Sequence, residues 1–169
     1  MEDSVDRHLA RWRDKAPFDE RTEAIVTRMQ FLVKLVHQAK DRALATVGLQ
    51  EFEFETLHRL ASRGKPWQAT PSELATELVV SPAGMTGRLD TLEQAGLVRR
   101  LRSEQDRRRV DVELTGEGHT RWLAAMDLRG QVEEQMVAAL DTSAQDTLNE
   151  LLKRMLVQAE AQGFRAAPA

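Results

Sequence analysis

The hydrophobic positions of this chain recur every three or four residues over most of its length, which is the spacing of a helix with one apolar face. The clearest case is the segment 21–45, whose apolar stripe suits packing along a second helix. The same period predicts further helices over residues 3–14 (with Val5, Leu9 and Trp12 on one face), over 51–63 and 117–139, and C-terminal to a cap at 143–146.

Two short helices with clear start signals lie in the middle of the chain. Thr70 precedes a proline and forms a capping box with Glu73, which predicts a helix start. Ser81 repeats the cap-and-proline signal about three residues after the first helix ends, and it opens a helix predicted over 82–95. Two capped helices separated by so short a turn predict a helix-turn-helix.

The period then changes from helix to strand. Residues 110–114 alternate apolar and charged side chains, as a half-buried strand does, and 97–102 supplies the partner strand with 103–108 as the tip. Between residues 98 and 109 lie six arginines and two acidic residues, a local net charge of +4 in a chain whose net charge is −3. A helix-turn-helix followed by a basic hairpin predicts binding to double-stranded DNA.

The start of helix 82–95 carries small side chains, which allow a helix N-terminus to lie close to base edges and phosphates. The candidates for DNA contact there are Ala83, Gly84, Thr86, Gly87 and Arg88. In the hairpin tip, Asp106 is placed to pair with Arg108 and hold it extended for a narrow minor groove. The alternative interpretation is an ordinary polar surface helix followed by a solvated run of charge.

Composition limits the class of protein. The chain has 169 residues, with 41% hydrophobic and 30% charged residues, and no apolar run approaches the roughly 20 residues that span a bilayer. We expect a cytoplasmic protein with no membrane partner, because the N-terminus carries no secretion signal. Cysteine is absent and the four histidines are scattered, so we expect no metal and no cofactor. No catalytic motif is present, so an enzyme is not expected.

The long helices that flank the basic hairpin carry more apolar surface than a small core needs, which favours a two-fold homodimer. The expected fold is mainly α (α+β), a winged helix-turn-helix with long N- and C-terminal dimerisation helices. The expected segments are an extension helix (1–20), a dimerisation helix (21–50), the winged helix-turn-helix DNA-binding domain (51–117), C-terminal dimerisation helices (118–162) and a loose tail (163–169).

The stretches LDTLEQAGLVRR and DRRRVDVELTGEG resemble the recognition-helix end, wing and following strand of the MarR family of bacterial winged-helix regulators. The family's wing commonly reads Asp-Pro-x-Asp-Arg-Arg. Here a Ser-Glu pair replaces the first two residues, whereas Asp106, Arg107 and Arg108 match. The resemblance covers about residues 20–160, and its specific motifs fall within 51–118.

This resemblance implies a homodimeric transcription factor, usually a repressor, bound to a pseudo-palindromic site whose half-sites lie about 34–36 Å apart. It places Arg107 in the wing and Arg108 in the minor groove, with Asp106 orienting Arg108. It also implies that the residues facing the major groove are Ser81, Ala83, Gly84, Thr86, Gly87 and Arg88.

The added N-terminal helix, the EFEFETL stretch and the AGMTGRLDTLE stretch resemble a narrower branch that includes urate-responsive regulators. That likeness implies a ligand site made by Trp12, Glu55, Arg88 and Arg100, with Glu55 where the branch has Asp. Two guanidinium groups suit a planar anion whose face an indole covers. The alternative is that Trp12 belongs to the core, Glu55 pairs with an arginine and both arginines contact phosphate.

Two further functional interpretations stay open at this point. One is a winged-helix module that binds protein instead of DNA. A wing without arginine and a recognition helix that starts with bulky acidic residues would favour it, and this chain has the opposite at both places. The other is a constitutive DNA-binding regulator with no ligand.

Overall fold

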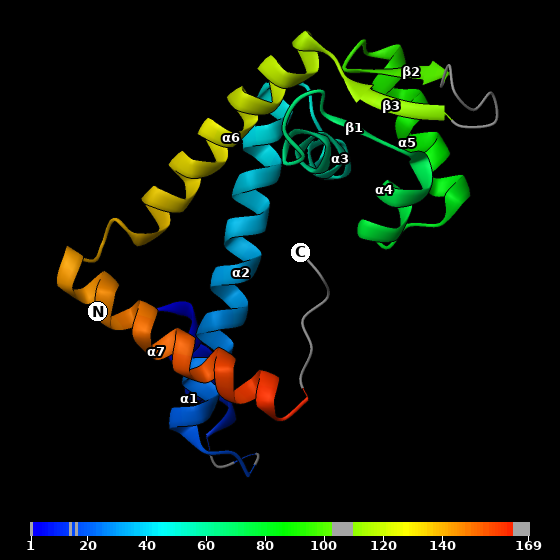
Figure 1. The fold of residues 1–169 in the computed structure, drawn as a ribbon. Helices are drawn as coiled ribbons and strands as arrows, with labels where there is room; N and C mark the ends of the chain where they lie inside the picture. Colours follow the sequence, from blue (N-terminus) through cyan, green and yellow to red (C-terminus); the bar gives the residue numbers. More distant parts are fainter. Residues whose placement is uncertain (1, 14, 16, 103–109, 164–169) are drawn as a thin grey trace. The chain divides into compact units, whose positions relative to one another are not determined.

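The computed structural model describes residues 2–13, 15, 17–102 and 110–163 (Figure 1). The chain divides into two compact units, Met1–Lys40 and Asp41–Ala169. Helices dominate, and the strands in these residues form one small antiparallel sheet, so the predicted mainly α winged fold is confirmed. Across the described ranges, no helix is long and apolar enough to cross a membrane.

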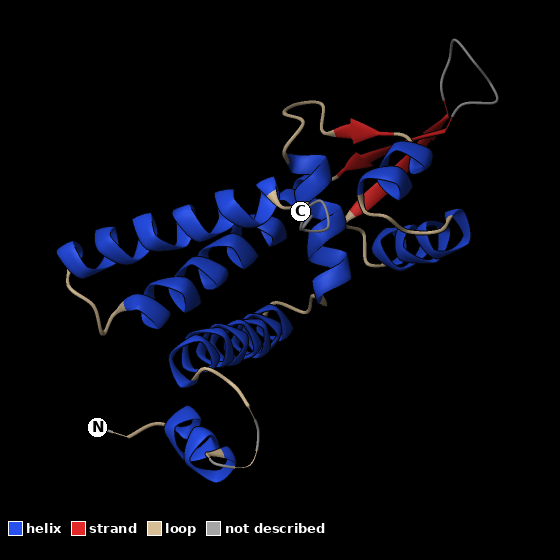
Figure 2. Ribbon diagram, turned by 90° about the horizontal axis from the view of Figure 1, so that it is seen from below, coloured by secondary structure: helices blue, strands red, loops and turns tan. Residues whose placement is uncertain are grey.

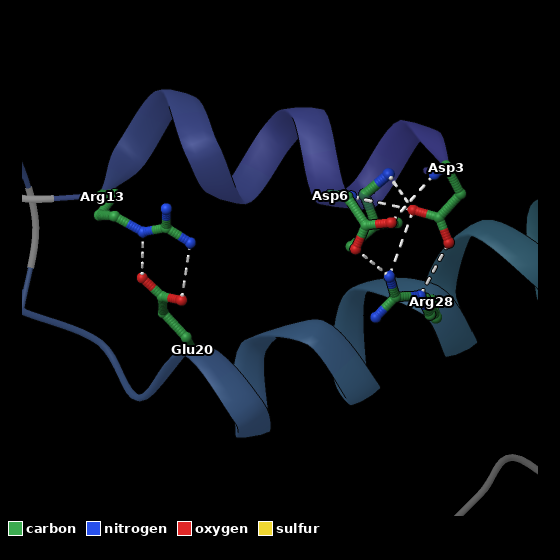
Figure 3. A network of polar contacts seen from close by, with 6 residues as sticks. Asp3, Asp6, Arg13, Glu20 and Arg28 are labelled. Carbon is green, nitrogen blue, oxygen red and sulfur yellow. Dashed lines mark hydrogen bonds and ion pairs between the residues drawn. The ribbon is translucent and has the colours of Figure 1, made fainter. Parts of the chain in front are cut away.

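In the first unit, α1 (Ser4–Trp12) lies beside the start of α2 (Glu20–Thr46) (Figure 3). Val5 and Leu9 are buried, as their spacing predicts, whereas Trp12 keeps 46% of its surface exposed. The helix is shorter than the predicted span 3–14 because Asp3 serves as its N-cap and the backbone leaves the helical conformation after Trp12.

A polar network ties α1 to α2 (Figure 3). The Asp3 carboxylate accepts hydrogen bonds from the amides of Val5 and Asp6 at 2.8 and 2.9 Å. It thereby satisfies two backbone donors that the helix N-terminus leaves without partners. Arg28 on α2 donates to Asp3 at 2.8 Å and also contacts Asp6. The hydrogen bond from Arg28, with those from the two amides, lowers the pKa of Asp3 from 3.8 to about 2.

The second unit contains the predicted winged helix-turn-helix. Its elements are α3 (Glu51–Ala61), β1 (Gln68–Ala69), α4 (Pro71–Glu77), α5 (Pro82–Gln94), β2 (Val98–Arg102), β3 (Val110–Leu114), α6 (Gly116–Val137) and α7 (Thr142–Ala161). The strands lie side by side in the antiparallel order β1-β3-β2, drawn in red in Figure 2. The core is apolar, and its most buried side chains are Leu44, Leu57, Leu60, Leu74, Met85, Leu89, Leu92, Leu97, Val112 and Leu114.

The junction between the hairpin and α6 is unusually tight. Thr115, the N-cap of α6, accepts a hydrogen bond from the Gly118 amide at 3.0 Å and donates its hydroxyl to the Gly96 carbonyl at 2.8 Å. Its own amide donates to the Leu97 carbonyl at 3.0 Å. A Cβ atom on Gly118 would lie 2.0 Å from that same carbonyl oxygen, so this position has room only for hydrogen.

Two further features differ from the sequence-based expectation. The cap predicted at 143–146 is wrong, because Asp141 caps α7 by accepting from the Ala144 amide at 2.8 Å. Strand β1 was not expected, and it pairs with β3 through Gln68↔Glu113 and Ala69↔Val112.

We expect Gly118→Ala to lower the free energy of unfolding by about 1–3 kcal/mol, because the new methyl group overpacks against a backbone carbonyl that cannot move away. The matched control is Gly130→Ala on the same helix, where a Cβ atom meets nothing within 4 Å. That change should be neutral or should stabilise by up to about 1 kcal/mol through helix propensity. Urea denaturation measures both, and equal effects would contradict the tight junction.

The Asp3 carboxyl should titrate near pH 2 in the folded chain. Because the folded pKa lies below the ordinary value of 3.8, the network stabilises α1 fully above about pH 4 and is lost as the pH falls toward 2. In Arg28→Met the pKa should move back toward 3.8. A carbon-13 NMR titration of the carboxyl groups measures this shift. Asp19, which binds Thr22 instead of Arg28, serves as the internal control and should not move.

Candidate nucleic-acid interface

The start of α5 is fixed by its cap. The Ser81 hydroxyl accepts a hydrogen bond from the Gly84 amide at 3.1 Å, and a proline occupies the first helical position. Helix α4 begins in the same way, since Thr70 and Glu73 form the predicted capping box. The helix-turn-helix predicted from these signals is therefore confirmed.

Helix α5 packs one face against the core and exposes the other to solvent. Met85, Leu89 and Leu92 are buried in the core. The five candidate residues on the open face are all exposed: Ser81, Ala83, Gly84, Thr86 and Gly87. A Cβ atom on Gly87 would meet nothing within 4 Å, so packing within the chain does not require glycine there. The open face therefore presents backbone and small side chains at the N-terminal end of a helix, which is the end that attracts phosphate oxygens.

Arg88 is less exposed than its neighbours on α5, with 23% of its side chain accessible. Its Nη1 donates to Oε2 of Glu55 on α3 at 3.3 Å. Its guanidinium carbon lies 5.4 Å from the centre of the Phe52 ring, also on α3. The structure thus brings together two members of the predicted ligand set, Arg88 and Glu55.

Arg100 on β2 has other partners. Its guanidinium donates to Oδ1 of Asp90 and to Oε2 of Glu93, both at 2.6 Å, and its amide donates to Oε1 of Glu93 at 3.0 Å. Partial burial lowers the pKa of Arg100, but these hydrogen bonds outweigh that effect and leave the pKa above its ordinary value. Arg100 therefore fastens the first wing strand to the C-terminal half of α5.

The fourth member of the predicted ligand set, Trp12, lies in the first unit. There it lines a cavity of about 310 Å³ with His8, Leu9, Phe18 and Glu23. In the second unit, Glu55 lies on the wall of a cavity of about 420 Å³ between α3 and α6, together with Phe54, His58, Met126 and Arg129. No group of three or more metal-ligating side chains gathers within the described part of the chain.

The wing strands pair over their whole length, from Val98↔Leu114 to Arg102↔Val110. Across them Glu113 on β3 accepts from Arg99 Nε at 2.9 Å and from Gln68 at 2.5 Å, so one carboxylate joins all three strands. The predicted tip residues Asp106, Arg107 and Arg108 lie outside the described residues.

The alternative in which Glu55 pairs with an arginine is present in the fold, but sequence reasoning missed the other partners of these arginines. Phe52, Asp90 and Glu93 were not singled out, although Asp90 and Glu93 are three residues apart on a helix and so share one face. That spacing is the available signal, but only the fold shows that the face meets Arg100. A second missed contact joins α3 to α6, where Trp122 donates from its indole nitrogen to Nδ1 of His58 at 3.2 Å.

We expect Arg100→Met to lower the free energy of unfolding by about 1 kcal/mol or slightly more, since it breaks a two-carboxylate network on a partly buried guanidinium. Arg99→Met is the matched control, because the Arg99 side chain is 61% exposed and holds one carboxylate. Its effect should stay below about 1 kcal/mol. Denaturation in urea distinguishes the two, and a larger loss for Arg99 would contradict the fastening role of Arg100.

Known proteins with the same helix-turn-helix and wing are similar to this chain in sequence and in structure. The family model described as the MarR family matches residues 49–110. The HTH-type transcriptional regulator PecS of Dickeya dadantii is 30% identical over 148 residues, which cover 87% of this chain and 89% of PecS. The transcriptional repressor MprA of Escherichia coli is 29% identical over 136 residues, or 79% of this chain and 76% of MprA.

Among solved structures, a mutant MarR from E. coli complexed with operator DNA is 29% identical, with a TM-score of 0.56, and the match covers 78% of this chain and 95% of that chain. These similar proteins are regulators of transcription, not enzymes. The chain spans most of the length of each and shares the family's helix-turn-helix and wing. It therefore belongs to the MarR family of transcriptional regulators.

Proposed function

We propose that this chain is a cytoplasmic repressor that binds a pseudo-palindromic operator as a homodimer and releases it when a small ligand binds. The observation that carries the proposal is the capped, exposed N-terminal face of α5 followed directly by the β2–β3 hairpin. The operator complex of the similar MarR protein supports the same use of this fold.

In this proposal α5 enters the major groove. The exposed Ser81, Ala83, Gly84, Thr86 and Gly87 let the helix N-terminus approach base edges and phosphates closely. Arg88 supplies the planar fork that pairs with a guanine edge. The helix has no acidic residue in its first turn, which favours DNA over a protein partner as its target.

The wing completes the contact. In this proposal Arg107 and Arg108 bind the DNA backbone and the minor groove, and Asp106 orients Arg108. The protein-interaction alternative is disfavoured by this concentration of arginine in the hairpin sequence.

A homodimer would cover apolar surface that a single chain leaves open. On α7 no residue is buried, and Leu148, Leu151, Leu152, Met155 and Leu156 each expose 39% or more of their surface. On α2, Ile25, Phe31, Leu32 and Leu35 each expose 45% or more. Contiguous exposed faces of this kind mark association surfaces, and a two-fold dimer places two copies of α5 about one DNA turn apart.

The proposed ligand is a small planar anion bound by Trp12, Glu55, Arg88 and Arg100. Both arginines already hold carboxylates, so an anion would have to displace Glu55 from Arg88, or Asp90 and Glu93 from Arg100. Such a ligand would favour a dimer with the wrong spacing of α5 helices and release DNA by population shift. A constitutive regulator without a ligand is the alternative.

The test is a salt titration of binding to the DNA upstream of the chain's own gene, compared with a scrambled duplex. We expect selective binding that weakens steeply with salt. Arg108→Ala should weaken binding to both duplexes and lower the salt dependence by about one released counterion. Arg11→Ala, an exposed arginine on α1, is the control and should change neither. Unchanged affinity and salt slope in Arg108→Ala would contradict the wing assignment.

The same titration is repeated with urate and related planar anions. Relief of operator binding by one of them supports the ligand proposal, and loss of that relief in Arg100→Met assigns it to the proposed site. Selective binding that no anion relieves favours the constitutive regulator. Failure to bind any duplex, including a pool of genomic fragments, favours the protein-interaction module.

A further inference from the structure

A groove of about 340 Å³ runs along α5 beside the first turn of α3. Its lining residues are Phe52 from α3 and Ala83, Gly84, Gly87, Arg88 and Thr91 from α5. Among these six, Phe52 and Arg88 carry the large side chains. The guanidinium carbon of Arg88 lies over the Phe52 ring, with small residues lining the rest of the groove.

The hydrogen bond and the aromatic contact of the Arg88 guanidinium both come from α3, although Thr91 of α5 also lines the groove. The α5 positions one and four residues before Arg88 are Gly87 and Gly84, which have no side chain to restrain it. The Phe52 ring lies 5.4 Å from the guanidinium carbon, within the roughly 6 Å over which a cation and an aromatic face attract each other. The Glu55 contact is long, at 3.3 Å, and joins a single pair of atoms.

These two contacts restrain different things. The single hydrogen bond to Glu55 restrains a distance but leaves the guanidinium free to rotate about that bond. The aromatic ring of Phe52 also limits how far the flat guanidinium can tilt. An arginine that reads guanine needs its fork in the plane of the base, and an arginine already ordered loses less conformational freedom when it binds.

We propose that Phe52 is a positioning residue for Arg88, whose ring restrains the guanidinium that reads the operator. This inference rests on the proposed function, because it takes Arg88 to contact a base. It assigns to α3 a part in sequence selectivity, although α3 is not itself one of the two helices of the helix-turn-helix.

The experiment compares Phe52→Leu with Phe52→Tyr, which keeps the aromatic face. The readout is the ratio of the affinities for operator and scrambled duplex. Phe52→Leu should lower this ratio about two- to fivefold, and Phe52→Tyr should keep it. Replacing each operator guanine by a deaza-guanine that lacks N7 locates the guanine read by Arg88. The penalty at that guanine should shrink in Phe52→Leu.

The chain offers a matched control on the same helix. Phe54 lies under a different arginine, Arg129 of α6, with 4.3 Å between the guanidinium carbon and the ring centre. Phe54→Leu should lower thermal stability, because Phe54 is buried, but it should leave the selectivity ratio of the folded protein unchanged.

A double variant separates positioning from a general structural effect. If Phe52 acts through Arg88, Phe52→Leu adds no loss of selectivity in the Arg88→Ala background. An equal loss in both backgrounds, or an equal weakening of operator and scrambled duplexes, overturns the positioning role. Selective wild-type binding that Phe52→Leu leaves intact overturns this inference alone, whereas a wild-type chain that selects no duplex overturns the proposed function together with it.

Discussion

The winged helix-turn-helix depends on the close approach of α6 to the backbone carbonyl of Leu97. The Leu97 carbonyl accepts the Thr115 amide, and Gly118 of α6 comes so close to it that no side chain fits. The Thr115 hydroxyl reaches the Gly96 carbonyl at the end of α5. The end of α5, the start of β2, the end of β3 and the start of α6 therefore meet at a single point. Because that point is closely packed, the recognition helix and the hairpin keep a fixed angle to each other.

Ion pairs strengthen the same arrangement and change how the charge pattern should be interpreted. Counted along the sequence, the hairpin has a local charge of +4. In the fold, Arg100 holds Asp90 and Glu93, and Arg99 holds Glu113. These carboxylates cancel much of the positive field of the strands at a distance. The local sum therefore overestimates the field on the strands, and Arg107 and Arg108 become more important to the proposed DNA contact.

How far the sequence predicts this structure depends on the range of the interactions involved. The caps at Thr70 and Ser81 and the alternation over 110–114 are local, and each was predicted within a residue or two. Strand β1 has two residues and exists because it pairs with β3 more than forty positions away, so no local period reveals it. The cap of α7 was misplaced because Asp141, Thr142 and Ser143 are consecutive cap formers, and the end of α6 decides among them.

The candidate site divides along the same line. The small residues at the start of α5 can be identified from the sequence, because their size is a property of each residue. The contact between Arg88 and Phe52 joins two helices, so the sequence alone does not show it. The sequence separation of 36 positions between Phe52 and Arg88 carries no signal of its own. Glu55 was named through a family likeness, and the fold places it on Arg88. The assignment of Glu55 to a ligand stays a prediction.

On the proposed function, DNA and ligand compete for one guanidinium. Arg88 cannot at once hold Glu55, read a base edge and bind an anion, because its fork offers a limited set of donors in one plane. A ligand that takes Arg88 therefore weakens operator binding at the site of contact itself, and by linkage operator DNA weakens ligand binding by the same factor. This local competition would act together with the proposed change in the spacing of the two α5 helices. On the same proposal Phe52 would act in both events, since a ring that restrains the guanidinium for a base also restrains it for a planar anion.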